Sequence, residues 1–563
     1  MAKKYVYFFG GGKAEGKAEM KNLLGGKGAN LAEMSNLGIP VPAGFTITTE
    51  MCTEYYRNKG SLPKSLIPEV NKAMAKVEKV MGKKYGDVKN PLLVSVRSGA
   101  RRSMPGMMDT VLNVGLCSKT LPGLISQSGD ERFAYDAYRR LIMMYADVVM
   151  EKAAGIAPKD GHSVREKLEH AMDAMKKRKG VVQDVDLNAE DLKALCDEFK
   201  DIVKKTIGKP FPDDANEQLW GGIRAVFQSW NGRRAISYRR IEGIPDEWGT
   251  AVNVQSMVFG NLGDTSATGV AFTRDPATGE NQFFGEWLVN AQGEDVVAGI
   301  RTPQPLNKAT KRSESKDMVS LEEQWPDLYK QLFAIRNRLE NHYRDMQDIE
   351  FTIENKKLYM LQTRTGKRTG TAAVRMAVEM AEKRLIDRDT AIMRVNPLQL
   401  DELLHPMLDP KEEKRAGVLA SGLPAGPGGG VGQVVLTADE AEKWAQQGKK
   451  VILVRNETSP EDVHGMHVAE AILTAKGGMT SHAALVARGW GKCCIVGCGA
   501  LHIDLAGKMI TVNGKTIKEG DWISMNGTLG KVYEGRVPVL PAEPERDKNY
   551  ATLMAWADKV RQI

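Results

Sequence analysis

Apolar residues recur with two different periods along this chain, and the changes of period mark the predicted elements. In residues 130–230 the period is helical, as in "ERFAYDAYRRLIMMYADVVMEKAAG". Residues 249–260 and 267–275 are apolar runs typical of strands, and residues 347–368 alternate around a polar turn, which predicts a β-hairpin. From about residue 432, strand-like and helix-like segments alternate. The pattern therefore predicts a multidomain chain of the α/β class, with helices and sheets mixed.

Clusters of glycine and proline interrupt this pattern. The segment "GGKGANLAEMSNLG" (25–38) predicts a glycine turn followed by a helix over about 28–36. The segment "ASGLPAGPGGGVGQVV" (420–435) is typical of the beginning of a new domain. The last stretch, "DKNYATLMAWADKVRQI", is helical and stops without a cap or a closing strand. We therefore expect the chain to end at a domain boundary.

Composition narrows the class of protein. The chain has 563 residues, which predicts three or four domains of roughly 150 residues each. It contains no run of about 18 apolar residues that would span a membrane. The net charge of +8 comes without a dense basic block, so neither a nucleic-acid partner nor a membrane partner is expected. Six scattered cysteines indicate a reducing compartment, and a cytoplasmic location is expected. The "CCIVGC" cluster (493–498) is better explained as a buried strand than as a metal site.

A histidine stands where a helix is predicted to begin. In "GGMTSHAALVARG" (477–489) the helix should start at Thr480 or Ser481, which places His482 in its first turn. Backbone N–H groups and the positive end of the helix dipole make such a position an anion site. The dipole also disfavours the imidazolium, so the ring stays neutral and nucleophilic near pH 7.

We therefore expect His482 to carry a phosphate. The hydroxyls of Thr480 and Ser481 would meet it, Gly478 would keep the approach open, and Arg488, six positions further on, would support it. A histidine that only caps a helix remains the alternative at this stage.

The N-terminal part offers candidates for binding the phosphate donor. "GGKG" (25–28) places Lys27 in a glycine-rich turn before a helix, although the motif is not a Walker A sequence. The loop "SVRSGARRSMPG" carries Arg97, Arg101 and Arg102, whose guanidinium groups suit bidentate phosphate contacts. A solvated basic loop explains the arginines equally well.

The predicted hairpin carries a more specific set of polar residues. Because side chains alternate along a strand, Asp348 and Glu350 should share one face, as should Gln362 and Arg364 on the partner strand. Oxygen ligands of this kind suit Mg²⁺ that bridges nucleotide phosphates. An ordinary exposed polar face is the alternative.

Together these motifs closely resemble the pyruvate, phosphate dikinase family of phosphoenolpyruvate-utilising enzymes. The resemblance is carried by "NLLGGKGANLAEM" (22–34), "PLLVSVRSGARRSMPGMMDTVLNVGL" (91–116), "WGTAVNVQSMVFGN" (248–261), "AQGEDVVAGIRTPQP" (291–305), "RDMQDIEFTIENKKLYMLQTRTGKRT" (344–369) and the histidine segment (454–499). It implies an ATP-grasp nucleotide-binding domain over 1–365 with a helical insertion at about 117–230, a helical connector over 366–419, a swivelling phosphohistidine β/β/α domain over 420–535, and a linker over 536–563.

The resemblance also implies a reaction and the residues that serve it. Such enzymes convert ATP, phosphate and pyruvate to AMP, pyrophosphate and phosphoenolpyruvate through a phosphorylated histidine, here His482. The expected cofactors are Mg²⁺ and a monovalent cation. A regulatory kinase/phosphatase is expected to modify Thr480, which would bring negative charge against the histidine. The residues that the resemblance assigns to ATP are Lys27, Arg97, Glu294, Asp348, Glu350, Gln362 and Arg364, with Glu350 and Gln362 as the metal ligands.

The chain departs from the family pattern at its end. Family members continue into a C-terminal α/β barrel that binds pyruvate, whereas this chain stops in what resembles the linker to that barrel. We therefore expect the ATP/phosphate half-reaction alone, with hinges at 420–432 and 536–550. The alternatives are a pyruvate, water dikinase or a related phosphohistidine phosphotransferase, which release inorganic phosphate, and a non-catalytic ATP-binding phosphocarrier. A nucleic-acid binder is a distant further alternative.

Overall fold

The computed structural model divides the chain into two compact units. It describes residues 3–104, 106–156, 163–297, 302–311, 317–397, 399–400, 407–540 and 547–561. Unit 1 comprises residues 1–266, 353–355 and 359–363, and unit 2 comprises residues 267–352, 356–358 and 364–563. The division therefore runs through the segment for which the sequence predicts one ATP-grasp domain, and the predicted domain boundaries remain predictions.

Unit 1 is built on an antiparallel sheet with the strand order β2-β1-β3-β8-β6-β7. Helix α1 packs on one face of this sheet, against β6 and β8, and α8 packs against β6, β7 and β8. A Cβ on Gly222 of α8 would lie 3.5 Å from Val96, so Val96 faces α8. Arg97 and Gly99 therefore face α1, because side chains alternate along a strand. The bounds are β1 Val6–Gly10, β2 Lys13–Ala14, β3 Gly44–Ile47, β6 Val94–Ala100, β7 Thr110–Val114, β8 Thr250–Ser256, α1 Lys21–Asn36 and α8 Ala215–Ser229.

The helical period predicted for residues 130–230 corresponds to a group of helices in unit 1. Helices α5 and α7 pack together, and α6 packs on α7. Capping boxes at Ser163 and Asn188 begin α6 and α7. The remaining bounds in this unit are α2 Thr49–Arg57, α3 Leu66–Met81, β4 Lys84–Tyr85, β5 Pro91–Leu92, α4 Leu121–Ser128, α5 Glu131–Tyr145, α6 Val164–Lys179, α7 Ala189–Ile207 and α9 Arg233–Glu242.

The second half of the chain begins with a five-stranded sheet of order β11-β10-β9-β12-β13. The predicted hairpin is present as β12 and β13, and its turn residues Asn355 and Lys356 have φ of 47° and 58°. Two central residues in the left-handed region are what a tight hairpin turn requires. The bounds are β9 Ala267–Phe272, β10 Phe284–Val289, α10 Gly293–Val297, β11 Gln304–Pro305, α11 Leu321–Gln324, α12 Pro326–Tyr343, β12 Gln347–Glu354 and β13 Lys357–Thr365.

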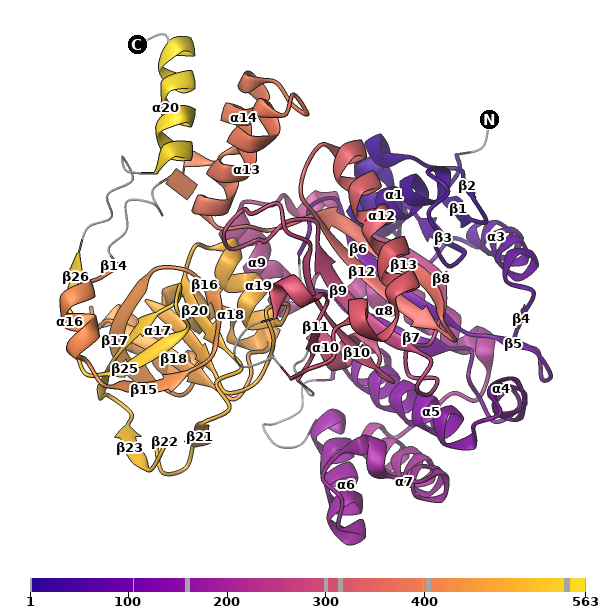
Figure 1. Ribbon diagram of the computed structural model, residues 1–563. Helices are drawn as coiled ribbons and strands as arrows, with labels where there is room; N and C mark the ends of the chain where they lie inside the picture. Colours follow the sequence, from indigo (N-terminus) through magenta and orange to yellow (C-terminus); the bar gives the residue numbers. More distant parts are fainter. Residues whose placement is uncertain are drawn as a thin grey trace. The chain divides into compact units, whose positions relative to one another are not determined.

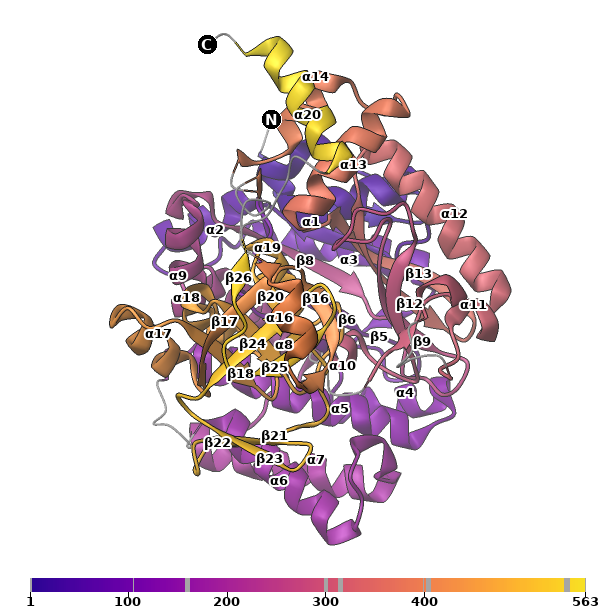
Figure 2. The ribbon, with the colours of Figure 1, turned by 60° about the vertical axis from the view of Figure 1, so that its left-hand side comes forward.

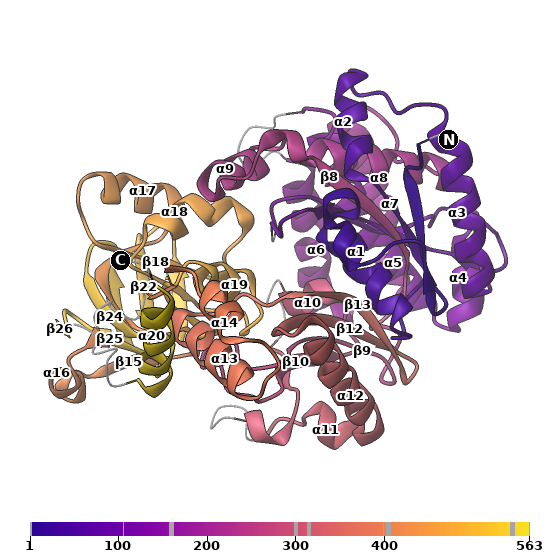
Figure 3. The same ribbon diagram turned by 90° about the horizontal axis from the view of Figure 1, so that it is seen from above.

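Three helices from two distant segments of unit 2 pack together. Helix α20 (Lys548–Val560), the last of the described chain, contacts α13 (Gly370–Glu382) and α14 (Arg388–Arg394), as Figure 3 shows. Their contact buries Leu553 among the side chains of Val374, Ala377 and Val378. The helical end of the sequence therefore packs onto the segment that precedes the last sheet.

The last sheet has eight strands in the order β15-β25-β24-β17-β18-β19-β20-β16 (Figure 1). Strands β17 to β20 are parallel, and α17, α18 and α19 connect them in turn. A separate meander of β21, β22 and β23 follows (Figure 2). The bounds are β15 Val418–Ser421, β16 Leu423–Gly426, β17 Gly429–Val435, α17 Ala438–Gln446, β18 Val451–Arg455, α18 Val463–Val468, β19 Ala471–Thr474, α19 His482–Gly489, β20 Cys493–Val496, β21 Leu501–Asp504, β22 Met509–Val512, β23 Lys515–Lys518, β24 Trp522–Asn526 and β25 Lys531–Glu534.

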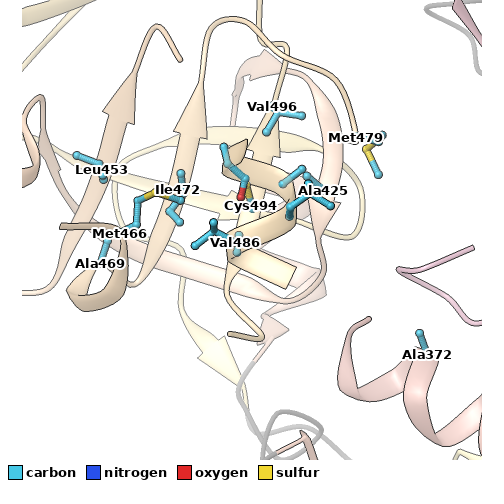
Figure 4. Packing of buried hydrophobic residues seen from close by; sticks show 14 of the residues in the cluster. Ala372, Ala425, Leu453, Met466, Ala469, Ile472, Met479, Val486, Cys494 and Val496 are labelled. Carbon is cyan, nitrogen blue, oxygen red and sulfur yellow. The ribbon is translucent and has the colours of Figure 1, made fainter. Parts of the chain in front are cut away.

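Buried apolar side chains pack beneath α19. Val486 of α19 lies among Met466, Ile472 and Cys494, and Figure 4 shows these side chains between the helix and the strands. Apolar burial of this kind is the main term that holds a short helix against a sheet. The position of the α19 N-terminus is therefore fixed by the sheet.

The predicted mixture of helices and sheets is confirmed. All six cysteines are buried and form no disulfide, and burial raises the pKa of Cys493 to about 12, which disfavours the thiolate that a metal would need. In the parts of the chain that the structure describes, no helix has the length and apolarity to cross a bilayer. The helix expected over about 28–36 is present: a kink at Gly25 separates it from the preceding helical residues, and it ends at Asn36.

Candidate active site

A kink at Gly25 brings α1 close to the strand that carries Arg97. Gly25 has φ 68° and ψ 168°, and helical geometry resumes at Gly26. A Cβ at Gly25 would lie 1.8 Å from the carbonyl oxygen of Gly99 on β6. Only glycine tolerates both this backbone conformation and this separation. The glycine turn predicted from "GGKG" is thus present, inside a longer helix, and it begins a new helical segment at the residue before Lys27.

Lys27 and Arg97 lie on the same face of the sheet in unit 1. A Cβ on Gly99 would be 3.6 Å from the Cβ of Lys27, and Arg97 shares that face because it is two residues earlier on the strand. Both side chains are half-buried. The other two arginines of the loop have partners elsewhere. Arg102 pairs with Glu242 at 2.8 Å, and the Arg101 guanidinium lies 5.6 Å from the centre of the Trp248 ring.

A third predicted residue lies close to this helix. The amide nitrogen Nδ2 of Asn30, one turn after Lys27, donates to the Thr363 carbonyl oxygen at 2.8 Å. Gln362, next to Thr363, is buried, with 4% of its surface exposed. Unit 1 therefore brings together Lys27, Arg97 and the part of β13 that carries Gln362.

Gly25→Ala is expected to lower the free energy of unfolding by about 2–4 kcal/mol, because it adds an overpacked contact to a strained backbone. Gly38→Ala is the matched control. Gly38 has φ 69°, and no atom lies within 4 Å of its Cβ position, so backbone strain alone should cost about 1–2 kcal/mol. Urea unfolding followed by circular dichroism measures both. Equal losses in the two variants would contradict the close approach of α1 to β6.

In unit 2 the acidic residues of the hairpin differ in their surroundings. Asp348 is buried and pairs with Arg364, whose Nε lies 2.6 Å from Oδ2. Its other oxygen, Oδ1, is buried without a hydrogen-bond partner. Burial raises the pKa of Asp348, although the Arg364 guanidinium acts in the opposite direction. Glu350 is half-buried. Arg364 therefore compensates one of the two carboxylate oxygens of Asp348. The ATP contacts predicted for Asp348, Glu350 and Arg364 remain predictions.

His482 is the first residue of α19, and Ser481 is its N-cap, as predicted. The helix follows β19, so the histidine lies beyond the carboxyl ends of the parallel strands, where open α/β sheets place their ligands. Thr458, which follows the neighbouring strand β18, contacts the ring: its Oγ1 is 3.0 Å from His482 Nδ1. This partner was not predicted, since nothing in "NETSPEDV" marks one of its hydroxyls for the histidine.

The loop before His482 binds a carboxylate that was also not predicted. The Met479 N–H donates to Glu286 Oε1 and the Thr480 hydroxyl donates to Oε2, each at 3.1 Å. Thr480 is fully buried. The Oγ atom of Ser481 is buried without a hydrogen-bond partner, which agrees with the expectation that it is available to an anion. Within the sequence, Glu286 is one acid in the apolar strand "FFGEWLV", and that is the only signal it gives.

Arg488 is placed differently from the prediction. Its side chain is 1% exposed, and its two Nη atoms donate to the carbonyl oxygens of Ala425 and Met479. It therefore holds the loop before His482 rather than facing a phosphate on the ring in this structure. Glu294 lies in α10, and its side chain is outside the described part of the chain.

Two families of known proteins match separate parts of the chain. Residues 21–66, 58–325 and 307–385 match the family described as "Pyruvate phosphate dikinase, AMP/ATP-binding domain". The chain belongs to the pyruvate phosphate dikinase family. Residues 447–530 match "PEP-utilising enzyme, mobile domain". The order predicted from the sequence, a nucleotide-binding part followed by a mobile domain, is confirmed by these two matches.

Curated relatives of the pyruvate phosphate dikinase family are similar to this chain along its whole length. Pyruvate, phosphate dikinase of Rhizobium meliloti (strain 1021) is 51% identical over 560 residues, covering 100% of the chain and 61% of the relative. The enzyme of the same name from Clostridium symbiosum is 51% identical with the same coverage. Pyruvate, phosphate dikinase 1, chloroplastic, of Oryza sativa subsp. japonica is 50% identical, with 56% of that protein covered. The chain thus spans about three fifths of the length of these relatives.

Proposed function

We propose that this chain carries out the ATP/phosphate half of the pyruvate, phosphate dikinase reaction. His482 takes the β-phosphoryl group of ATP, the γ-phosphoryl group joins inorganic phosphate, and AMP and pyrophosphate leave. The observation that carries the proposal is His482 itself, at the N-terminus of α19 and beside a loop that already binds an anionic group. Transfer from phosphohistidine to pyruvate, as in the complete dikinase, is part of the same proposal.

The surroundings of His482 support its role as the nucleophile. Because Thr458 engages Nδ1, we assign Nε2 to the phosphoryl group, with Nδ1–H donating to Thr458 Oγ1 in the reactive tautomer. The positive end of the helix dipole would disfavour the imidazolium form of the ring and stabilise the negative charge of a bound phosphate. The Ser481 hydroxyl and the first-turn N–H groups would donate hydrogen bonds to the oxygens of that phosphate.

The residues proposed for the nucleotide site supply positive charge to balance the negative charge of the ATP phosphates. Lys27 and Arg97 would bind the phosphates of ATP from one face of the unit 1 sheet. The expected Mg²⁺ fits Glu350 and Gln362, since this ion takes one or two protein oxygens and completes its shell with nucleotide phosphates and water. When bound, the ion would neutralise charge on the transferring phosphoryl group.

The proposal is tested with ATP labelled in the β-phosphate, with Mg²⁺, and with inorganic phosphate present or omitted. We expect acid-labile, base-stable label on the protein that depends on phosphate, with AMP and pyrophosphate in equal amounts. Label that forms without added phosphate, with inorganic phosphate released, would instead assign the chain to the water-dikinase type. If the chain bound ATP but no label reached the protein, the chain would be a non-catalytic ATP-binding protein, and the proposal would be overturned.

We retain Thr480 as the proposed target of a regulatory kinase/phosphatase. Its hydroxyl donates to Glu286 and is fully buried in this structure. A phosphate on that hydroxyl would meet the Glu286 carboxylate at hydrogen-bond distance, where two negative charges repel strongly. Phosphorylation of Thr480 would therefore break its hydrogen bond to Glu286.

A further inference from the structure

The Glu286 carboxylate is buried in an apolar strand and bonds to the histidine loop. Glu286 is 8% exposed and lies in β10 between Gly285 and Trp287, which is fully buried. A buried carboxylate is costly unless donors compensate its charge. Two such donors come from the loop before His482: the Met479 N–H and the Thr480 hydroxyl. The loop before His482 therefore supplies two of the donors that compensate the buried charge.

The loop is shaped to let the carboxylate approach. A Cβ at Gly478 would lie 2.4 Å from Glu286 Oε2, and the three nearest atoms to that position all belong to the Glu286 carboxylate. Gly478 does not have a positive φ. A Cβ at this position would therefore have to displace the Glu286 carboxylate, whereas the backbone conformation itself would tolerate one.

Met479 is held from both sides. Glu286 accepts from its N–H, and Arg488 Nη2 donates to its carbonyl oxygen. Burial lowers the pKa of Arg488, and nearby carboxylates, among them Asp348 and Glu286, act in the opposite direction. We call these two contacts to the Met479 backbone the Met479 clamp. The clamp lies three residues before His482, so it fixes the path by which the chain enters α19.

We propose that Glu286 is a positioning residue that, through the Met479 clamp, holds the His482 loop in the geometry that accepts a phosphoryl group. The proposal rests on the phosphohistidine function proposed above. The Thr480 hydroxyl that Glu286 occupies is also a group expected to bind the phosphate, so the incoming phosphate competes with the carboxylate. Glu286 therefore holds the loop before transfer, and the contact weakens once His482 is phosphorylated.

Single-turnover labelling from β-labelled ATP tests this role. Glu286→Ala is expected to lower the maximum rate of labelling at least tenfold, with the ATP concentration at half-maximum unchanged. Glu286→Gln keeps an oxygen acceptor for the Met479 N–H and should recover part of the rate. A wild-type rate in Glu286→Ala, or an equal loss of rate and of apparent ATP affinity, would overturn the proposal.

A double substitution tests the contact itself. Gly478→Ala should slow labelling in the wild-type background and have no further effect in the Glu286→Ala background, because its clash is with Glu286 alone. Gly499→Ala is the control, since no atom lies within 4 Å of that Cβ position. Effects of Gly478→Ala and Glu286→Ala that simply multiply would show that the two residues act independently, and the proposal would fail.

Hydrogen exchange separates this proposal from the function on which it rests. In the wild-type protein without ATP, the Met479 amide should exchange slowly, and Glu286→Ala should speed its exchange at least tenfold. That result stands even if no label ever reaches His482, in which case the proposed function alone fails. Rapid exchange of this amide in the wild-type protein would refute the clamp.

Discussion

His482→Ala is expected to abolish the transfer of label from β-labelled ATP to the protein. Loss of a nucleophile from a catalytic group of this kind lowers rates on the order of 10⁶-fold, which is below detection in a labelling experiment. Because the substitution truncates a half-buried side chain at the first position of α19, the fold should persist. The measurement is acid-labile label per protein chain, after a time in which the wild-type protein is fully labelled.

The matched control is His502→Ala. His502 is exposed on β21, and its ring nitrogen Nδ1 lies 3.3 Å from the Ala500 carbonyl oxygen. It should label like the wild-type protein. Full label on the His482→Ala protein would mean that another residue is the nucleophile, and the proposed role of His482 would be wrong.

Lys27→Ala is expected to lower the rate of labelling at subsaturating ATP by about 10²-fold or more. Removal of one charged or hydrogen-bonding group that stabilises a transferring phosphoryl group has effects of this size. Lys27 is half-buried and is the second residue after the kink in α1. It faces the strand that bears Arg97. The rate should be measured across a range of ATP concentrations, together with direct binding of ATP.

Lys21→Ala provides the comparison, because Lys21 is an exposed lysine at the first position of the same helix. Its rate should stay within about twofold of the wild-type value. If Lys27→Ala and Lys21→Ala gave the same small effect, the glycine-rich segment of α1 would not be the phosphate site. The proposal that Lys27 and Arg97 bind the ATP phosphates together would then fail.

Local patterns predicted the elements that depend on neighbours in sequence. The alternation at 347–368 gave the hairpin, and Ser481 followed by a helical period gave the start of α19. The signals are strong because a strand and a helix cap are each specified within a few residues. The glycine turn before Lys27 was also predicted from neighbouring residues. The four helical residues ahead of the turn were not predicted, because no periodic pattern marks them.

The contacts that surround His482 could not be predicted in this way. Glu286 and Met479 are 193 positions apart in the sequence, and Thr458 reaches the ring from the strand next to β19. No periodicity relates such residues, because their proximity follows from the order of strands in a sheet. The contacts of Arg488 could not be predicted either, since its helical phase left its target open and packing turned it toward Met479 and Ala425.

The two chain segments that enter and leave the eight-stranded sheet are fastened to each other. Met407 pairs with Leu540 and Leu408 with Val539, as the short strands β14 (Met407–Leu408) and β26 (Val539–Leu540). A domain on a single flexible tether explores a sphere whose radius is set by the tether length. A domain on two tethers that are paired side by side is restricted more than a domain on one, because it remains attached through both. For the carrier role proposed for His482, lengthening one of the two tethers alone would therefore extend the reach of the histidine little.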